Sequence, residues 1–196
     1  MMKIMLDAGH GYNTPGKRSP DGFREYEFNR EVACFIRDML GDFENVTVYF
    51  AHSDKRDVPL VERTDYANQL QVDCYVSIHA NAHGSGGWST ANGIETFVHC
   101  SRPTEALELA ENVQRRLIEN TKLKNRGVKA ADFHVLRKTN MTAVLVECGF
   151  MTNKEEVKLL RSDEFQKTCA NAIVQALEKQ YGLQRDAKVH FSDLTI

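Results

Sequence analysis

Short apolar runs alternate along the chain with longer stretches in which apolar residues recur every three or four positions. The short runs are nearly continuous in apolar residues, which is typical of strands covered by helices on both faces. We expect strands at residues 3–6, 46–50, 75–78, 94–98 and 143–146. The longer stretches predict helices at residues 27–40, 60–71, 104–121, 153–160 and 163–181. Glu156, three residues after Asn153, predicts a capping box at the start of the fourth helix.

This alternation indicates βαβ units and therefore an α/β fold, a three-layer sandwich whose mainly parallel, twisted sheet has helices on both faces. Residues 1–182 form one domain in this prediction, and the role of residues 183–196 stays open. Two polar, glycine-rich loops, residues 11–22 and 82–93, follow predicted strands. Loops that leave the carboxyl ends of parallel strands build the functional site of such sheets, so we expect the site there.

Composition and charge exclude several classes of function. The 196 residues are 42% hydrophobic and 27% charged, the balance of a globular protein, and the net charge of -2 offers no broad basic field for nucleic acid. No run of about 18 apolar residues predicts a membrane span, and the N-terminus lacks the features of a signal peptide. We therefore expect synthesis in the cytoplasm without membrane insertion. The five cysteines form no CxxC pair, which predicts buried, reduced thiols.

Two histidines lie where predicted strands end. His10 follows the first strand and stands between two glycines, and His79 follows the third strand and precedes Ala80. Small neighbours leave an imidazole uncrowded, whereas a histidine packed in a core usually has bulky apolar neighbours. Two strands that bring histidines to one edge of a sheet can build a metal site. A catalytic zinc ion usually takes three protein ligands and keeps a fourth position open.

Three glutamates are candidates for the rest of this site. Glu25 lies where the first glycine-rich loop enters a helix, but spacing favours Glu27 equally, and both fit ordinary first-turn acids stabilised by the helix dipole. Glu147 ends an apolar strand. An unpaired buried carboxylate is costly, so Glu147 is paired, protonated or functional. Beside an activated water it would act as a general base with a raised pKa, and the alternative is an ion pair with Arg63 or Arg137.

The sequence at these positions resembles the zinc-dependent N-acetylmuramoyl-L-alanine amidases of the Amidase_3 family, found in bacterial autolysins and phage endolysins. The matching motifs follow the family's order between about residues 2 and 181: residues 6–11, 22–25 with 29, 59–60 with 63 and 67–68, 77–81, 93–96, 126–129 with 135–137, and 143–150 with 153. The resemblance implies zinc ligands at His10, Glu25 and His79 and a catalytic carboxylate at Glu147. It thereby favours Glu25 over Glu27.

The resemblance also implies the substrate. It is peptidoglycan, cleaved at the amide bond between the lactyl group of N-acetylmuramic acid and L-alanine. Arg63, Asn81 and Glu95 are candidate substrate-binding residues, since a guanidinium fork such as that of Arg63 fits a stem-peptide carboxylate. Trp88 and His134 are further candidates for the cleft, with ordinary packing as the alternative. We expect a monomer that acts on the bacterial cell wall, as a phage endolysin or a host autolysin.

Three rival functions remain at this point. A zinc peptidase would use the same residues on a different amide bond. A metal-free glycosidase would use Glu25 and Glu147 as its pair of carboxylates, which leaves the two histidines unexplained. A wall-binding module without catalysis would have no need of the ligands or the base.

Overall fold

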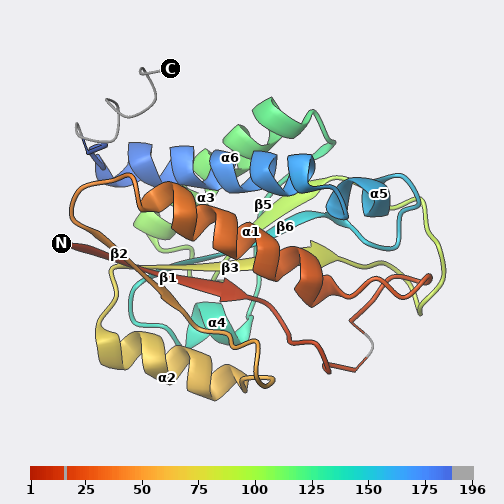
Figure 1. Ribbon diagram of the computed structural model, residues 1–196, viewed down its shortest axis with the longest axis horizontal. Coiled ribbons are helices and arrows are strands. Elements are labelled where there is room, and N and C mark those ends of the chain that lie inside the picture. Colours follow the sequence, from red (N-terminus) through yellow and green to blue (C-terminus); the bar gives the residue numbers. More distant parts are fainter. Residues whose placement is uncertain (16, 187–196) are drawn as a thin grey trace, which may run out of the picture.

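A six-stranded sheet lies between helices on both faces in the computed structural model, which describes residues 1–15 and 17–186 (Figure 1). The strands are β1 (Met2–Ala8), β2 (Val46–Phe50), β3 (Cys74–Asn81), β4 (Ile94–Val98), β5 (Asn125–Ala130) and β6 (Thr142–Phe150), in the order β2-β1-β3-β6-β4-β5. Neighbouring strands are parallel, except that β4 is antiparallel to β6. The predicted α/β sandwich with a mainly parallel sheet is therefore confirmed.

The helices divide unequally between the two faces of the sheet. They are α1 (Glu25–Leu40), α2 (Leu60–Leu70), α3 (Thr104–Thr121), α4 (His134–Arg137), α5 (Glu156–Leu160) and α6 (Asp163–Tyr181). The long helices α1, α3 and α6 cover one face, and α2 and the short α4 lie on the other (Figure 1). The face under α2 and α4 is therefore covered less completely.

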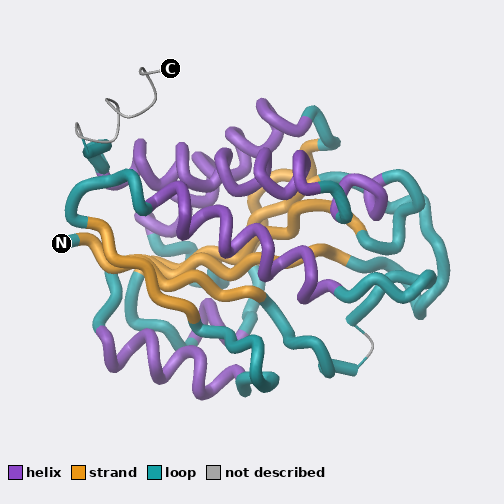
Figure 2. The backbone as a smooth tube through the Cα atoms, viewed as in Figure 1, coloured by secondary structure: helices purple, strands orange, loops and turns teal. Residues whose placement is uncertain are grey.

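Side chains alternate between these two faces along each central strand. In β3, Cys74, Val76 and Ile78 pack in the larger core with α1, α3 and α6, while Tyr75 packs in the smaller core near α2 and α4. Ser77 and His79 continue the Tyr75 series, so they face the thinly covered side. β1 and β3 run toward the same end of the molecule, where long loops gather (Figure 2).

The structure differs from the sequence-based expectations at several elements. β5 and α4 were not expected, and α1 begins at Glu25 rather than Glu27. The predicted reciprocal capping box is wrong. The side chain of Asn153 does accept hydrogen bonds from the backbone of Glu155 and Glu156. The Glu156 carboxylate, however, accepts from the backbone N–H groups of Gly93 and Phe150, each at 2.7 Å, and so ties the start of β4 to the end of β6.

The described part of the C-terminal segment continues along the fold beyond α6. The backbone carbonyl of Gln184 accepts a hydrogen bond from Glu44, and Asp186 donates one to Asp42, so residues 184–186 run beside the α1–β2 connection. Residues 187–196 lie outside the described part of the chain. Within that part, no helix combines the length and the apolar character needed to cross a membrane.

All five cysteines are free thiols, as expected from the absence of paired motifs. Cys74, Cys148 and Cys169 are buried and Cys34 is half-buried. Cys100 is exposed, so the expectation of burial is wrong for this residue. It lies just after β4, in a turn that leads to α3, where the apolar run has already ended.

Candidate metal and catalytic site

His10, Glu25 and His79 meet at the end of the sheet toward which β1 and β3 run. One ligand atom of each lies within 4.8 Å of the others. Glu25 bridges the two rings, since its Oε2 is 3.2 Å from His10 Nε2 and its Oε1 is 2.9 Å from His79 Nδ1. Among the described residues this is the one cluster of His, Cys, Asp or Glu side chains with the spacing of a metal site. The structure therefore brings together the three residues that the motifs indicated.

The position of this group follows from the topology of the sheet. The chain passes from β1 to β2 on one side and later returns to β3 on the other side of β1. This change of direction opens a crevice at the carboxyl ends of β1 and β3, the usual place for a site in an open α/β sheet. His10 leaves β1, and His79 lies in β3 itself, one strand pair away. Glu27 is half-buried on α1 and is not part of the group.

The backbone around His10 has an unusual conformation that brings the His10 ring close to His79 and Glu25. His10 has a φ of 67°, in the left-handed region that costs a non-glycine residue roughly 1–3 kcal/mol and is concentrated at functional sites. Arg63 holds the segment in place by donating to the carbonyl oxygens of Ala8 and His10. A Cβ atom at Gly9 would lie 2.1 Å from Cε1 of His79, so only glycine lets this loop pass so close to the ring.

Glu25 is buried and heavily hydrogen-bonded. Burial alone would raise its pKa, but the close contacts of its two oxygens with the His10 and His79 rings outweigh burial and lower the pKa of Glu25 well below its usual range. The backbone N–H of Ala80 also donates to Oε1 at 3.2 Å. Glu25 is consequently an ionised carboxylate at the entrance of α1, with both oxygens turned toward the histidines.

Glu147 lies beside His79, its partner across the β3–β6 pair. Its Oε2 atom is buried and has no hydrogen-bond partner among the described residues. Burial raises the pKa of Glu147 to about 8; the His79 ring opposes this shift, and the charges of Glu25 and Glu95 add to it. The alternative for Glu147, an ion pair with Arg63 or Arg137, is wrong, because Arg63 pairs with Asp7 and Arg137 pairs with Asp132. An unpaired carboxyl group with a raised pKa suits proton transfer near neutral pH.

A cavity of about 700 Å³ opens over these residues. Its floor includes His10, His79 and Glu147. The walls are formed by the first glycine-rich loop, by the segment before α2 and by the start of α4: Thr14, Pro15, Lys17, Asp57, Val58, Pro59, Leu60, Phe133, His134 and Val135. His134 therefore lines the cavity, which was one of the two alternatives for this residue. Trp88 instead borders a separate shallow depression with Asn153 and Lys154.

The candidate substrate-binding residues have protein partners in this structure. The guanidinium of Arg63 bonds to Asp7 and to three backbone carbonyl groups, although the residue also lines the cavity. Asn81 donates to Glu95 at 2.7 Å. Glu95 also pairs with Arg126 at 2.6 Å and with Lys129, and it faces Glu147 across the β4–β6 pair. Their contact with substrate stays a prediction.

Two polar residues behind the site were present in the motifs but had no assigned role. Asp7 and Ser77 are buried, lie opposite each other in the β1–β3 pair and are hydrogen-bonded at 2.8 Å. The sequence could have indicated their role, because Asp7 and Ser77 are polar residues within otherwise apolar strands. His52 accepts a hydrogen bond from the backbone N–H of Ala8 at 3.1 Å. Burial lowers the pKa of His52 to about 4, so it is a neutral acceptor that fixes the end of β1.

Comparison with known proteins agrees with this geometry. The Amidase_3 family model, described as N-acetylmuramoyl-L-alanine amidase, matches residues 4–179. The chain belongs to this family. The N-acetylmuramoyl-L-alanine amidase CwlM of Bacillus licheniformis is 30% identical over 188 residues, which cover 95% of this chain and 72% of the relative. The endolysin of Bacillus phage SPP1 is 31% identical over 93% of this chain and 67% of its own length.

Solved structures of amidases share the fold of this Amidase_3 domain. The N-acetylmuramoyl-L-alanine amidase from Clostridium difficile 630 superposes with a TM-score of 0.87 at 32% identity, covering 92% of this chain and 97% of that chain. The catalytic domain of CwlV from Bacillus (Paenibacillus) polymyxa gives a TM-score of 0.85 at 30% identity, covering 93% of this chain and 99% of that chain. The family indicated by the motifs is thus confirmed by sequence and by fold.

Proposed function

We propose that this chain is a zinc-dependent N-acetylmuramoyl-L-alanine amidase. It hydrolyses the amide bond between the lactyl group of N-acetylmuramic acid and L-alanine in peptidoglycan, and it acts at the bacterial cell wall as a monomer. The observation that carries the proposal is the group of His10, Glu25 and His79, whose two histidines line a cavity together with the unpaired carboxyl group of Glu147. Membership of the Amidase_3 family supports the choice of bond.

The chemistry of the donor set fits zinc. Two imidazole nitrogens and one carboxylate oxygen are a common ligand set of catalytic zinc sites, and here these atoms lie within 4.8 Å of one another. When bound, zinc polarises the scissile carbonyl group and lowers the pKa of a water molecule toward ~7. Because three protein ligands leave a coordination position open, the site has room for this chemistry.

Glu147 carries the proton in the proposed reaction. Its free Oε2 accepts a proton from the water that attacks the carbonyl carbon, and the protonated Glu147 then donates to the nitrogen of L-alanine as that amine leaves. A carboxyl group whose pKa lies near the working pH can both accept and return this proton. The walls of the cavity, which include apolar Leu60 and Phe133 and the cation of Lys17, offer the surfaces that would contact the substrate.

The geometry disfavours the glycosidase reading. Glu147, with its raised pKa, would be the acid of such a carboxylate pair, so Glu25 would have to be the nucleophile or the base. Both oxygens of Glu25 are engaged by histidine nitrogens, which leaves neither oxygen free for that role. A zinc peptidase would share the site but cleave a bond within the stem peptide. The bond that is cleaved therefore has to be measured directly.

Product analysis and one matched pair of variants test the proposal. Purified protein is assayed for zinc and then incubated with peptidoglycan, and mass spectrometry is expected to show stem peptides with a free L-alanine amino group and intact glycan strands. Glu147→Gln should keep the zinc and lose about 100-fold to 10,000-fold in turnover. The control Glu44→Gln changes an exposed glutamate and should behave as wild type. Full activity of Glu147→Gln, or products cut between amino acids, would refute the assignment.

A further inference from the structure

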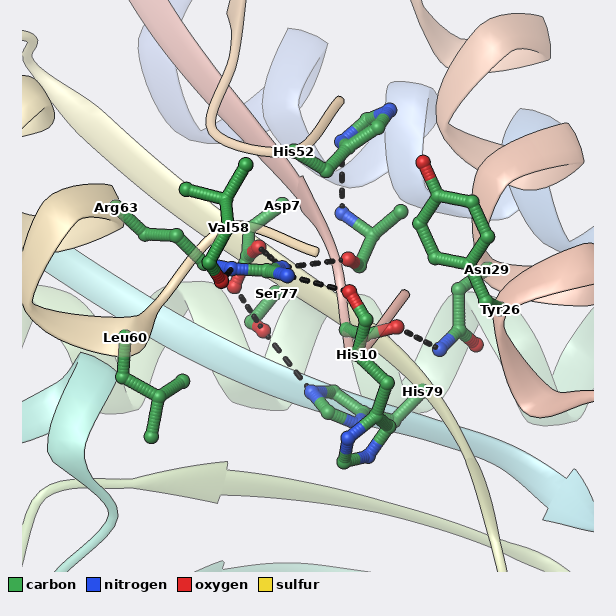
Figure 3. Close-up of polar contacts among 12 residues, drawn as sticks. Asp7, His10, Tyr26, Asn29, His52, Val58, Leu60, Arg63, Ser77 and His79 are labelled. Carbon is green, nitrogen blue, oxygen red and sulfur yellow. Dashed lines mark hydrogen bonds and ion pairs between the residues drawn. The ribbon is translucent and has the colours of Figure 1, made fainter. Parts of the chain in front are cut away.

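A chain of hydrogen bonds runs from His79 to a buried ion pair (Figure 3). Nε2 of His79 is 3.1 Å from Oγ of Ser77, and this hydroxyl oxygen is 2.8 Å from Oδ2 of Asp7. The other carboxylate oxygen of Asp7 pairs with Nη1 of Arg63 at 2.6 Å. All three residues behind His79 are buried, with Asp7 only 1% and Arg63 2% exposed.

The direction of each hydrogen bond in this chain is determined. Burial would raise the pKa of Asp7, but its ion pair with Arg63 and its hydrogen bonds lower the pKa, so Asp7 is ionised and can only accept. The single hydroxyl hydrogen of Ser77 is therefore donated to Asp7. The oxygen of Ser77 then accepts a hydrogen from Nε2 of His79.

We propose that Ser77 and Asp7, anchored by Arg63, are positioning residues that hold His79 with its hydrogen on Nε2 and so present Nδ1 as the metal ligand. The inference rests on the proposed function, because it assumes that this site binds zinc. Nδ1 faces Oε1 of Glu25 at 2.9 Å, and two acceptors at that distance attract each other only through a shared proton or cation. With the hydrogen of His79 on Nε2, a metal ion held by Nδ1 and Oε1 would meet this requirement.

The same ion pair also supports the other histidine ligand. Arg63 donates to the carbonyl oxygen of His10, whose backbone has the strained left-handed conformation described above. One buried pair thus orients His79 through its carboxylate side and His10 through its guanidinium side (Figure 3). Buried ion pairs contribute little net stability compared with apolar residues of similar size. The Arg63–Asp7 pair therefore has a function in orienting the ligands. Groups that hold a metal-bound histidine strongly affect metal affinity.

Two variants of nearly equal shape isolate the hydroxyl group of Ser77. Ser77→Thr keeps the hydroxyl, and Ser77→Val replaces it with a methyl group. In competition with a zinc chelator, we expect Ser77→Val to bind zinc about 10-fold to 100-fold more weakly than Ser77→Thr. Thr96→Val serves as a control, because Thr96 is a fully buried strand residue whose hydroxyl bonds to Gln114, away from the ligands. This control should lower the unfolding temperature without changing zinc affinity.

Nitrogen NMR of zinc-loaded wild-type protein with ¹⁵N-labelled histidine tests the same inference without a variant. The His79 ring is expected to carry its hydrogen on Nε2 and none on Nδ1. A hydrogen on Nδ1, or equal zinc affinity in Ser77→Val and Ser77→Thr, would overturn the positioning role while leaving the proposed function intact. If Ser77→Val fails to fold, the NMR result decides. A wild-type protein that binds no zinc would overturn both proposals.

Discussion

Replacement of Gly9 by alanine is a sensitive test of the site, because it adds one carbon atom against the His79 ring. The new Cβ would lie 2.1 Å from Cε1, 2.4 Å from Nε2 and 2.6 Å from Nδ1. Ordinary contact begins at 3.4 Å, so the ring or the loop must move by about 1.3 Å, the difference between 3.4 and 2.1 Å. The ring has little freedom to move, since Ser77 and Glu25 hold its two nitrogens.

We expect Gly9→Ala to fold, because Gly9 is not among the residues with positive φ and alanine can adopt its backbone conformation. Zinc affinity should fall by about 10-fold to 100-fold, as when the support of a ligand is lost. Turnover at saturating zinc should fall by about 100-fold, the usual effect of an ångström-scale displacement of a reacting group. The assays are chelator competition, peptidoglycan hydrolysis at several zinc concentrations and thermal unfolding.

Gly87→Ala is the matched control. Gly87 lies in the second glycine-rich loop, and an added Cβ there would meet no atom within 4 Å. It should leave zinc affinity, turnover and unfolding temperature unchanged. Wild-type zinc affinity and turnover in Gly9→Ala would show that the close approach of this loop to His79 does not constrain the site.

Three further predictions concern the ligands, the buried ion pair and the thiols. Glu25→Ala should lose zinc while Glu27→Ala keeps it, as measured by metal content after dialysis; equal retention would remove Glu25 from the ligand set. Asp7→Asn should lower the free energy of unfolding at pH 7 by about 3–5 kcal/mol, because it breaks a buried ion pair. The folded pKa of Asp7 is lowered from 3.8, so this stabilisation is present above about pH 4 and is lost as the pH falls through the folded pKa. In urea denaturation the difference in the free energy of unfolding between wild type and Asp7→Asn should therefore become smaller below pH 4. A difference that stays constant with pH would contradict the assigned ion pair. A thiol reagent should modify exposed Cys100 first and half-buried Cys34 more slowly under native conditions, and rapid reaction of all five thiols would contradict the burial of the rest.

Local patterns were sufficient to predict most of the sheet and the long helices. Apolar runs marked the buried strands, and recurring apolar residues marked the helices that cover them. β5 was not predicted because it is a polar edge strand with no buried residue. α4 was not predicted because four residues are too few to show a helical period. The chain also continues in the strand conformation past residue 78, so that His79 lies within β3 rather than after it.

The site was only partly predictable because its geometry depends on contacts between distant residues. Spacing could not separate Glu25 from Glu27, since the start of α1 is set by a hydrogen bond from Glu25 to the carbonyl of Lys17 across the loop. The Arg63–Asp7 pair joins α2 to β1, and no local pattern indicates which acid a given arginine will meet. Charge alone left an ion pair between Arg63 and Glu147 open as one alternative, and the fold pairs Arg63 with Asp7 instead.

The candidate metal ligands and the candidate base come from different parts of the chain, so different strand pairings bring them into place during folding. The three candidate ligands lie within residues 10–79 and need β1, α1 and β3, whereas the base comes from β6 in the second half of the chain. Both the β1–β3 and the β3–β6 pairings join segments about 70 residues apart, and such distant contacts form slowly. In a refolding experiment, recovery of metal binding reports the first pairing and recovery of hydrolysis reports the second.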